Sequence, residues 1–220
     1  MSLKLYFSPG ACSFVPHALL ELADASFEPQ IVKLASGEQK TPEYLALNPR
    51  AQVPVLVADG TVLTQVVAIV SYISDLFPDS HFLPKDPMAK AQVLSTLAWM
   101  NNSAHPTFTH VFRPYYFAES DAAMADVKAF NTAKFHTVLA EVDAMAAKAN
   151  PWIAGEHVGP LDLYATVLMR WGGMGAGKDP QTLPHLWAHA QKVAALPAVA
   201  RAIERERINL NMYKPPEKAA

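Results

Sequence analysis

The stretch "KLYFSPGACSFVPHALLEL", residues 4–22, passes from a strand into a helix, and the only cysteine of the chain, Cys12, lies at the turn. The alternation in "LKLYF", residues 3–7, predicts a short strand. The periodicity of residues 13–25 predicts a helix with one apolar face, made of Val15, Leu19, Leu22 and Ala23. A cysteine at such a turn is either a reactive thiol or a small apolar filler.

The next segments extend this strand and helix into a domain. "FEPQIVKL", residues 27–34, predicts a second strand, in which Pro29 favours the edge of a sheet or a bulge. "TPEYLALN", residues 41–48, predicts a short helix capped by Thr41. "VPVLVADGTVLT", residues 53–64, joins two apolar runs through Asp-Gly, which is a strong hairpin signal. "QVVAIVSYISDLF" follows as a helix whose mostly buried residues are expected to be Val67, Ile69, Val70 and Ile73.

The order of these elements predicts a thioredoxin-like domain over residues 1–77. It favours a four-stranded mixed sheet in which right-handed crossovers link the first three strands and the last two strands pair as a hairpin. The fold class expected from this half is α/β.

The pattern of the sequence changes at residue 78. Prolines at 78, 84 and 87 mark a linker over residues 78–87, and Asp86-Pro87 is typical of a helix start. Residues 88–220 look entirely helical, with one long helix over 88–117, a second over 121–149 that opens at Ser120 or Asp121, a third over 161–171, and two shorter ones after Pro184 and Pro197. We therefore expect an α/β domain followed by an all-α domain.

Composition limits the function. The chain has 220 residues, one cysteine and a formal net charge of −2, so it needs no disulfide and gives no electrostatic reason to expect nucleic acid as a partner. No signal-peptide pattern occurs in residues 1–30, and no apolar run approaches the roughly 18 residues of a membrane span. We expect a cytoplasmic protein with small-molecule or protein partners. An apolar content of 51% leaves room for a subunit interface.

Several motifs carry a resemblance to a known family. "KLYFSPGACS" resembles the first strand and cysteine-bearing loop of beta-class, or bacterial, cytosolic glutathione transferases. "NPRAQVPVLV" resembles the family's cis-proline segment, with Pro54 as the proline, and "GPLDLYATVLMRW" resembles its helix-capping segment. His105 in "WMNNSAHPTF" also falls at a beta-class site position. The resemblance covers nearly the whole chain. It implies an enzyme, a glutathione transferase, acting with glutathione as co-substrate and without a metal.

The resemblance also implies roles around the sulfur. A helix start favours thiolate over thiol, so Cys12 is expected to be a catalytic thiol capable of thiol-disulfide chemistry. His105 is expected to act as a donor near the sulfur. Tyr6 and Ser13 flank the loop, and either hydroxyl is a further expected donor. The alternatives are that Cys12 is a buried apolar filler and that His105 is a satisfied core or surface group.

Glutathione is expected to bind beside Pro54. Gln52 and Val53 precede this proline, and the main chain of Val53 is expected to pair with the ligand as an added strand. Gln65 is expected to accept from the ligand's α-amino group and the amide of Val66 to donate to its carboxylate, although Val66 lacks the hydroxyl usual in the family. Lys33 is expected to reach the glycine carboxylate. Gln65 as a mere helix cap and Lys33 as a solvated strand end are the alternatives.

The helical domain is expected to supply the wall for an apolar electrophile, with simple helix packing as the alternative role of each candidate: Phe108, Phe112, Tyr115 and Tyr116. Asp162 is expected to reach back to the Gly159 amide as part of a structural capping box. The glycines of "RWGGMGAGKDP", residues 170–180, are expected to form a helix-to-helix loop, because no Gly-Lys-Ser/Thr ending makes them a phosphate loop.

Two other functions fit the sequence. One is a glutathione-transferase-like binding or scaffold protein with little turnover, suggested by the missing hydroxyl at Val66. The other is a Cys-His hydrolase, although no carboxylate that would orient His105 can be identified. The resemblance further implies a homodimer, in which the first domain of one subunit packs on the helical domain of the other. It does not identify the electrophile.

Overall fold

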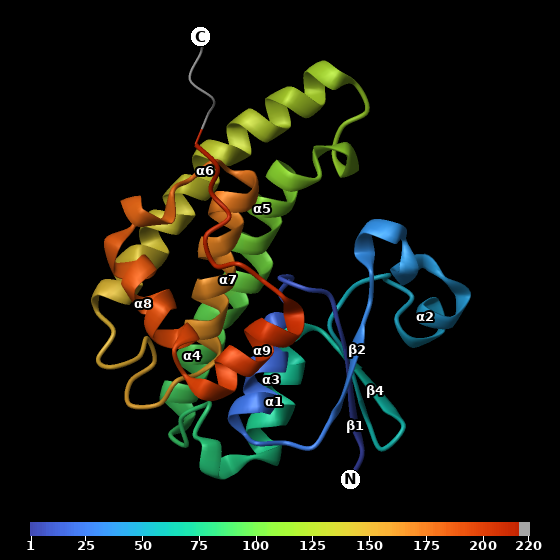
Figure 1. The fold of residues 1–220 in the computed structure, drawn as a ribbon, viewed down its shortest axis with the longest axis vertical. Coiled ribbons are helices and arrows are strands. Elements are labelled where there is room, and N and C mark those ends of the chain that lie inside the picture. Colours follow the sequence, from blue (N-terminus) through green and yellow to red (C-terminus); the bar gives the residue numbers. More distant parts are fainter. Residues whose placement is uncertain (216–220) are drawn as a thin grey trace.

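The computed structural model describes residues 1–215, in which a mixed sheet with its helices is followed by a helical domain (Figure 1). The sheet has the strand order β2-β1-β3-β4. Its elements follow one another along the chain as β1 (Leu3–Phe7), α1 (Phe14–Leu22), β2 (Glu28–Ile31), α2 (Pro42–Leu47), β3 (Val55–Ala58), β4 (Thr61–Thr64) and α3 (Val66–Leu76). The predicted thioredoxin-like domain is confirmed.

One detail of the predicted topology is wrong. β2 runs parallel to β1, as a crossover through α1 requires, but β3 runs antiparallel to β1. The connection from β2 to β3 is therefore not a parallel crossover. β4 pairs with β3 across the two-residue turn Asp59-Gly60, in which both residues have positive φ. Pro29 lies on β2, which is an edge strand as expected.

The helical domain contains α4 (Pro87–Trp99), α5 (His105–Phe112), α6 (Asp121–Ala147), α7 (Pro160–Gly175), α8 (Pro184–Ala194) and α9 (Pro197–Glu206). The predicted domain extends to residue 220, and residues 216–220 lie outside the described part of the chain. In Figure 1, α1 and α3 lie between the sheet and the helical domain, while α2 lies beyond the other face of the sheet.

The long helix predicted over 88–117 is interrupted. A π-helical turn, Met100–Ala104, separates α4 from α5, and the helix ends at Phe112 ahead of a short 3₁₀ turn, Pro114–Tyr116. Pro106 explains the π turn, because a proline ring inside a regular α-helix collides with the carbonyl four residues earlier. The prediction of a distortion at Pro106 is correct, and the prediction of a helix running to residue 117 is wrong.

The predicted helix starts are confirmed by their caps. The side chains of Thr41, Asp86 and Ser120 each accept a hydrogen bond from the backbone amide three residues later. The Asp162 carboxylate accepts from the Gly159 amide at 2.8 Å, as expected for the acidic half of a capping box.

The predicted glycine-rich loop begins later than expected, because α7 continues to Gly175. Close packing explains the glycines within this helix. A Cβ on Gly172 would lie 2.6 Å from Leu139, and one on Gly173 would lie 2.7 Å from the backbone nitrogen of Tyr213. After α9 the chain leaves the helical state and runs back along α7 (Figure 1). The glycines allow this return segment to approach the helix.

α1 is buried nearly all round, not on one face. Every residue from Phe14 to Glu21 is buried, whereas Leu22 and Ala23 of the predicted apolar face are only partly buried. The reason is that α7 and α9 cover the side of α1 that faces away from the sheet (Figure 1). In α3, Val67 was expected to be mostly buried but is only partly buried, whereas the neighbouring Val66 is buried. Polar side chains on the outer face of α1 therefore need partners in the helical domain.

Over residues 1–215, no helix is both long and apolar enough to cross a membrane.

Candidate active site

The loop from Ser8 to Ser13 carries Cys12 and is closed by the Ser13 side chain. The Ser13 hydroxyl accepts from the Ser8 amide at 3.1 Å and donates to the Ser8 carbonyl at 3.2 Å. Ser13 is fully buried, and its one hydroxyl proton is used inside the loop. The structure therefore contradicts the prediction that Ser13 donates to the sulfur.

The middle of this loop, Gly10, is held by the helical domain. Its amide donates to Glu206 Oε2 at 2.7 Å, and its carbonyl accepts from Trp171 Nε1 at 2.9 Å and from Arg170 at 3.3 Å. Gly10 has a φ of +69°, and a Cβ there would lie 2.4 Å from the Arg170 guanidinium. Only glycine combines this backbone conformation with this close approach.

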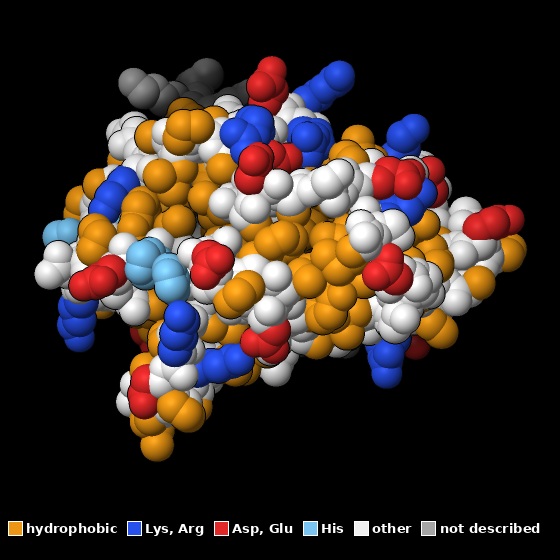
Figure 2. Space-filling view, turned by 90° about the horizontal axis from the view of Figure 1, so that it is seen from below, with side chains coloured by type: hydrophobic (Ala, Val, Ile, Leu, Met, Phe, Trp, Pro, Cys, Tyr) orange, Lys and Arg blue, Asp and Glu red, His pale blue; other side chains and the backbone are white. Residues whose placement is uncertain are grey.

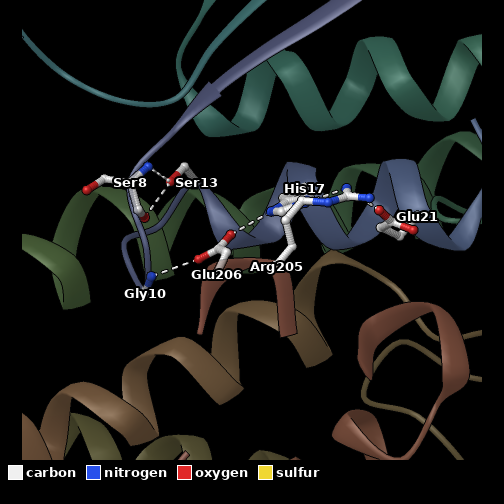
Figure 3. Close-up of polar contacts among 7 residues, drawn as sticks. All are labelled: Ser8, Gly10, Ser13, His17, Glu21, Arg205 and Glu206. Carbon is white, nitrogen blue, oxygen red and sulfur yellow. Dashed lines mark hydrogen bonds and ion pairs between the residues drawn. The ribbon is translucent and has the colours of Figure 1, made fainter. Parts of the chain in front are cut away.

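A chain of polar contacts continues from Gly10 along the outer face of α1 (Figure 3). Glu206 Oε1 lies 2.7 Å from His17 Nδ1, and both side chains are fully buried. Arg205 donates to His17 Nε2 at 3.2 Å and to the Glu21 carboxylate. Because a guanidinium can only donate, His17 Nε2 must accept, and its proton lies on Nδ1, facing Glu206. The first and last described helices of the protein are thereby connected around the cysteine loop.

Cys12 lies next to the segment that precedes Pro54. Its Sγ donates to the Val53 carbonyl at 3.7 Å, and the residue is 6% exposed. Burial raises the pKa of the Cys12 thiol to about 12, and hydrogen bonds from its own amide and that of Ser13 oppose this only in part. The expectation of a thiolate created by the helix start is therefore wrong, because burial favours the protonated thiol of Cys12.

The Val53–Pro54 peptide is cis, as the resemblance implied. The carbonyl of Gln52 accepts from the Tyr44 hydroxyl and the Asn48 side chain, each at 2.8 Å, while the Gln52 side chain is exposed. These contacts fix the main chain entering the cis bond. The structure thus brings together Cys12, Val53 and Pro54, three residues that the sequence analysis placed in one site.

Gln65 and Val66 lie at the start of α3. Gln65 is exposed, has φ 73° and ψ 125°, and its side chain makes no capping hydrogen bond. Gln65 occupies the N-cap position, where its carbonyl accepts from the Ile69 amide, but its side chain does not cap the helix. Its positive φ is typical of a functional position. Val66 is 2% exposed and its side chain packs in the core, so only its backbone amide, in the first turn of α3 where amides lack intrahelical partners, is available to bind a ligand. Lys33 is exposed just after β2, where the Glu38 carboxylate accepts from its amide at 2.5 Å.

Tyr6 lies on the other side of the sheet from Cys12. Side chains alternate along β1, so Phe7 packs with Cys12 in the main core, whereas Tyr6 packs with Tyr44, at 6.0 Å between ring centroids. The prediction that the Tyr6 hydroxyl donates to the sulfur is therefore wrong, because the sheet separates the two groups.

His105 begins α5 and contacts α7. Its Nδ1 lies 3.1 Å from the Tyr164 hydroxyl, which also lies 3.1 Å from Asn101 Oδ1. The His105 ring packs on Trp171 at 4.6 Å between centroids. Burial, and then the positive charge of Arg113, lower the pKa of His105 to about 4, so the imidazole is neutral at neutral pH. Burial raises the pKa of Tyr164, and the charge that Cys12 would carry as a thiolate raises it further, which relates this group to the cysteine loop.

The candidate aromatic wall divides into two parts. Phe108 is 4% exposed and stacks on Trp171 at 4.7 Å, so its role is core packing and the prediction that it contacts an electrophile is wrong. Phe112 stacks on Phe108 but is 48% exposed. Tyr115 and Tyr116 are 59% and 53% exposed, in the 3₁₀ turn that follows α5. The rings of Phe112, Tyr115 and Tyr116 are exposed, as side chains that contact an electrophile must be.

Sequence analysis missed the residues that join the two domains at the loop, which are Gly10, Trp171 and Glu206, and it missed Tyr164, which bonds to His105 within the helical domain. Two spacings in the sequence could have indicated these residues. Tyr164 and Trp171 are seven positions apart, so they lie on the same face of a helix, and His17 and Glu21 are four apart on an otherwise apolar helix. The partners of Tyr164 lie 59 and 63 residues away, and those of Trp171 and Glu206 lie 161 or more residues away, so no local pattern identified them.

Fold and site together define a two-domain protein of the thioredoxin-like class, with a single cysteine facing a cis-proline and a helical domain over the loop. A family model for the N-terminal domain of glutathione S-transferases matches residues 1–75. A glutathione S-transferase of Xanthomonas campestris, GST-4.5, is 35% identical over 94% of this chain and 100% of its own length.

Solved structures agree. A sphingomonad glutathione S-transferase complexed with glutathione is 34% identical, with a TM-score of 0.80 over 94% of this chain and all of that one. A beta-class glutathione S-transferase of Sphingomonas chungbukensis is 30% identical, with a TM-score of 0.80 over 92% of this chain and 98% of that one. The chain therefore belongs to the glutathione S-transferase family, and its predicted likeness to the beta class is confirmed.

Proposed function

We propose that this glutathione S-transferase binds glutathione in an extended form along Val53 and transfers it to an apolar electrophile held over the helical domain. The observation that carries the proposal is the contact between Cys12 Sγ and the carbonyl of Val53 at the cis-proline. It places a sulfur-bearing loop beside main chain suited to strand-like pairing with a peptide. The sphingomonad relative was solved with glutathione bound, which supports the choice of ligand.

The remaining ligand contacts follow from the start of α3. The amide of Val66 belongs to the first turn of a helix, where amides lack intrahelical partners and favour a carboxylate. The exposed Gln65 side chain accepts from the α-amino group, and Lys33 reaches the other end of the tripeptide. The missing hydroxyl at position 66 costs one hydrogen bond of about 0.5–1.5 kcal/mol, which weakens binding several-fold.

Calorimetric titration with glutathione tests this proposal. We expect binding heat and a rise in melting temperature at millimolar glutathione, because a ligand above its Kd stabilises the fold that it binds. Gln65→Ala should weaken binding, whereas Gln181→Ala, an exposed glutamine in the helical domain, should not. Absence of both heat and stabilisation in the unmodified protein contradicts the proposal.

Cys12 adds a second chemistry to the proposal. Its thiolate attacks a glutathione disulfide, one sulfur leaves as glutathione thiolate, and a Cys12–glutathione mixed disulfide forms. With one cysteine in the chain, a second glutathione must resolve it by releasing oxidised glutathione. The raised pKa of Cys12 makes this step slow, because little thiolate is present at neutral pH.

The mixed disulfide is measurable by mass spectrometry of the native protein. Oxidised glutathione should add one glutathionyl group, dithiothreitol should remove it, and Cys12→Ala should abolish the adduct. If native Cys12 resists both oxidised glutathione and iodoacetamide until the protein unfolds, it is a filler and the redox role is withdrawn.

The electrophile is proposed to lie against the exposed rings of Phe112, Tyr115 and Tyr116. Tyr116→Ala should raise the KM for an aromatic electrophile and leave the Kd of glutathione unchanged. Phe130→Ala is the matched control, because Phe130 is an aromatic residue that is 64% exposed, on α6. Equal effects of the two variants contradict the assignment of the wall.

A homodimer is proposed from the family resemblance and the apolar composition. Figure 2 shows apolar side chains over much of the centre of one face, with charged side chains scattered among them. Sedimentation at micromolar concentration should give a species of twice the 24.0 kDa chain mass. A single species at the chain mass contradicts the proposal.

A further inference from the structure

Three polar side chains from three segments form a directed chain at the boundary of the proposed site. His105 Nδ1 and Asn101 Oδ1 each lie 3.1 Å from the Tyr164 hydroxyl. Asn101 lies in the π-helical turn, His105 begins α5 and Tyr164 is buried in α7. The turn forced by Pro106 therefore sets Asn101 and His105 against one tyrosine.

The direction of each hydrogen bond follows from the chemistry of the groups. Asn101 Nδ2 donates to Asn102 Oδ1 at 2.8 Å, which leaves Asn101 Oδ1 facing Tyr164. A carbonyl oxygen can only accept, so Tyr164 spends its single proton on Asn101. The Tyr164 oxygen must then accept from His105, which places the imidazole proton on Nδ1. His105 Nε2 is left with a free lone pair.

His105 is also connected to the cysteine loop. The Trp171 ring packs on His105, and the indole Nε1 of the same residue donates to Gly10, two positions before Cys12. One rigid side chain thus separates the imidazole from the loop that carries the sulfur. The proton acceptor on His105 and the proposed glutathione site are therefore in one neighbourhood.

We propose that Asn101 and Tyr164 are positioning residues that hold His105 in its Nδ1-protonated form, so that its Nε2 accepts the proton of the glutathione thiol. The inference rests on the proposed function, because it requires glutathione beside Val53. It reverses the donor role expected from sequence.

The proton transfer is balanced within the site. The S–H bond of glutathione breaks, its electron pair stays on sulfur, and a bond forms between the proton and His105 Nε2, giving a thiolate beside an imidazolium. Burial and Arg113 keep His105 uncharged at neutral pH, and the neighbouring Tyr164 hydroxyl and Cys12 thiol are also neutral. The new thiolate supplies the negative charge that stabilises the imidazolium.

Nitrogen-15 NMR of the imidazole rings tests the tautomer directly, because protonated and bare ring nitrogens have different shifts. The His105 signals are assigned by their loss in His105→Gln, which is needed because the chain has 8 histidines. At neutral pH we expect the proton on Nδ1. Tyr164→Phe should remove that preference, whereas Tyr72→Phe, a partly buried tyrosine on α3, should not change it.

Activity gives a second readout. Tyr164→Phe should lower kcat/KM for conjugation by about 10-fold or more, in the range of general acid-base effects, with little change in the Kd of glutathione. Asn101→Asp should retain the tautomer and most activity, because a carboxylate also only accepts, whereas Asn101→Leu should behave like Tyr164→Phe.

The outcomes separate this inference from the proposed function. A proton on His105 Nε2 in the unmodified protein overturns the inference, whether or not glutathione binds. The same is true if Tyr164→Phe changes the tautomer but leaves the pH profile and kcat/KM unchanged. Failure of glutathione to bind contradicts the proposed function, and the proton-transfer step with it, but leaves the measured tautomer standing.

Discussion

The cysteine loop is held at its two ends in one way and at its middle in another. Its ends meet through Ser8 and Ser13, five residues apart and both within the thioredoxin-like domain. Its middle, Gly10, is bonded to Trp171 and Glu206, which are 161 and 196 residues away in the helical domain. The first domain can close this loop by itself, but its position relative to the sulfur site depends on the packing of the second.

The two faces of α1 show the same contrast. Most buried side chains of α1 are apolar, whereas His17 and Glu21 bond to residues of α9, and the His17 ring also packs on Phe7 of β1. Arg201 and Arg205 reach Glu21 from α9, and both arginine side chains are more exposed than their partner. The boundary between the domains is thus a polar network that contains two buried carboxylates, Glu21 and Glu206.

The largest loss of stability is expected from removing the Glu206 side chain, which joins the two domains. Glu206→Ala leaves the Gly10 amide and His17 Nδ1 without an acceptor, and unsatisfied buried donors cost about 1–3 kcal/mol each. We expect a loss of about 2–4 kcal/mol in the free energy of unfolding, measured by urea denaturation. Glu204→Ala, an exposed glutamate on the same helix, is the control. Equal stability of the two variants shows that the middle of the loop does not depend on α9.

A smaller effect is expected for the ends of the loop. Ser13→Ala removes the acceptor of the buried Ser8 amide, which should cost about 1–2 kcal/mol of unfolding free energy. Ser36→Ala serves as the comparison, because its hydroxyl donates to Lys33 at an exposed turn. The melting temperatures of the two variants, measured by thermal unfolding, show this difference. If Ser13→Ala also leaves the melting temperature unchanged, the closure seen between Ser8 and Ser13 is not a stabilising contact.

The contact through Trp171 should contribute less to stability. Trp171→Phe removes one donor to the Gly10 carbonyl, while Arg170 still donates and the aromatic stack on Phe108 remains. We expect a loss of about 0.5–1.5 kcal/mol in unfolding free energy, together with faster alkylation of Cys12 by iodoacetamide, because the loop is less restrained. Trp187→Phe is the matched control on α8. Unchanged alkylation contradicts a restraining role.

The smallest effect on stability and activity is expected for Tyr6, on the face of the sheet opposite Cys12. Tyr6→Phe keeps the ring that packs on Tyr44 and removes only a hydroxyl that the sheet separates from Cys12. Its unfolding free energy should change by less than about 0.5 kcal/mol, and kcat/KM for glutathione conjugation should be roughly unchanged. A large loss of activity without a loss of stability restores Tyr6 to the site.

Local patterns predicted most of the fold. Asp59-Gly60 placed the hairpin, Thr41 and Asp86 placed two helix starts, and the prolines of the linker separated the domains, because caps and turns depend on neighbours in sequence. The π turn before Pro106 and the extension of α7 to Gly175 were not predicted. The extension of α7 depends on which side chains pack against the helix, and a sequence window does not contain them. The π turn follows from Pro106, for which the sequence predicted a kink but not its form.

The sequence by itself determined the thioredoxin-like order of elements, the family resemblance and the meeting of Cys12 with Val53 and Pro54. The tertiary structure alone decided the protonation states of Cys12 and His105 and the hydrogen-bond partners of the cysteine loop. Burial, not sequence position, raises the pKa of Cys12, and the alternation of β1 removes Tyr6 from the sulfur. Hydrogen bonds between distant helices orient His105 and hold Gly10. Such contacts arise only when the chain is folded, because burial and hydrogen-bond direction are set by groups far apart along it.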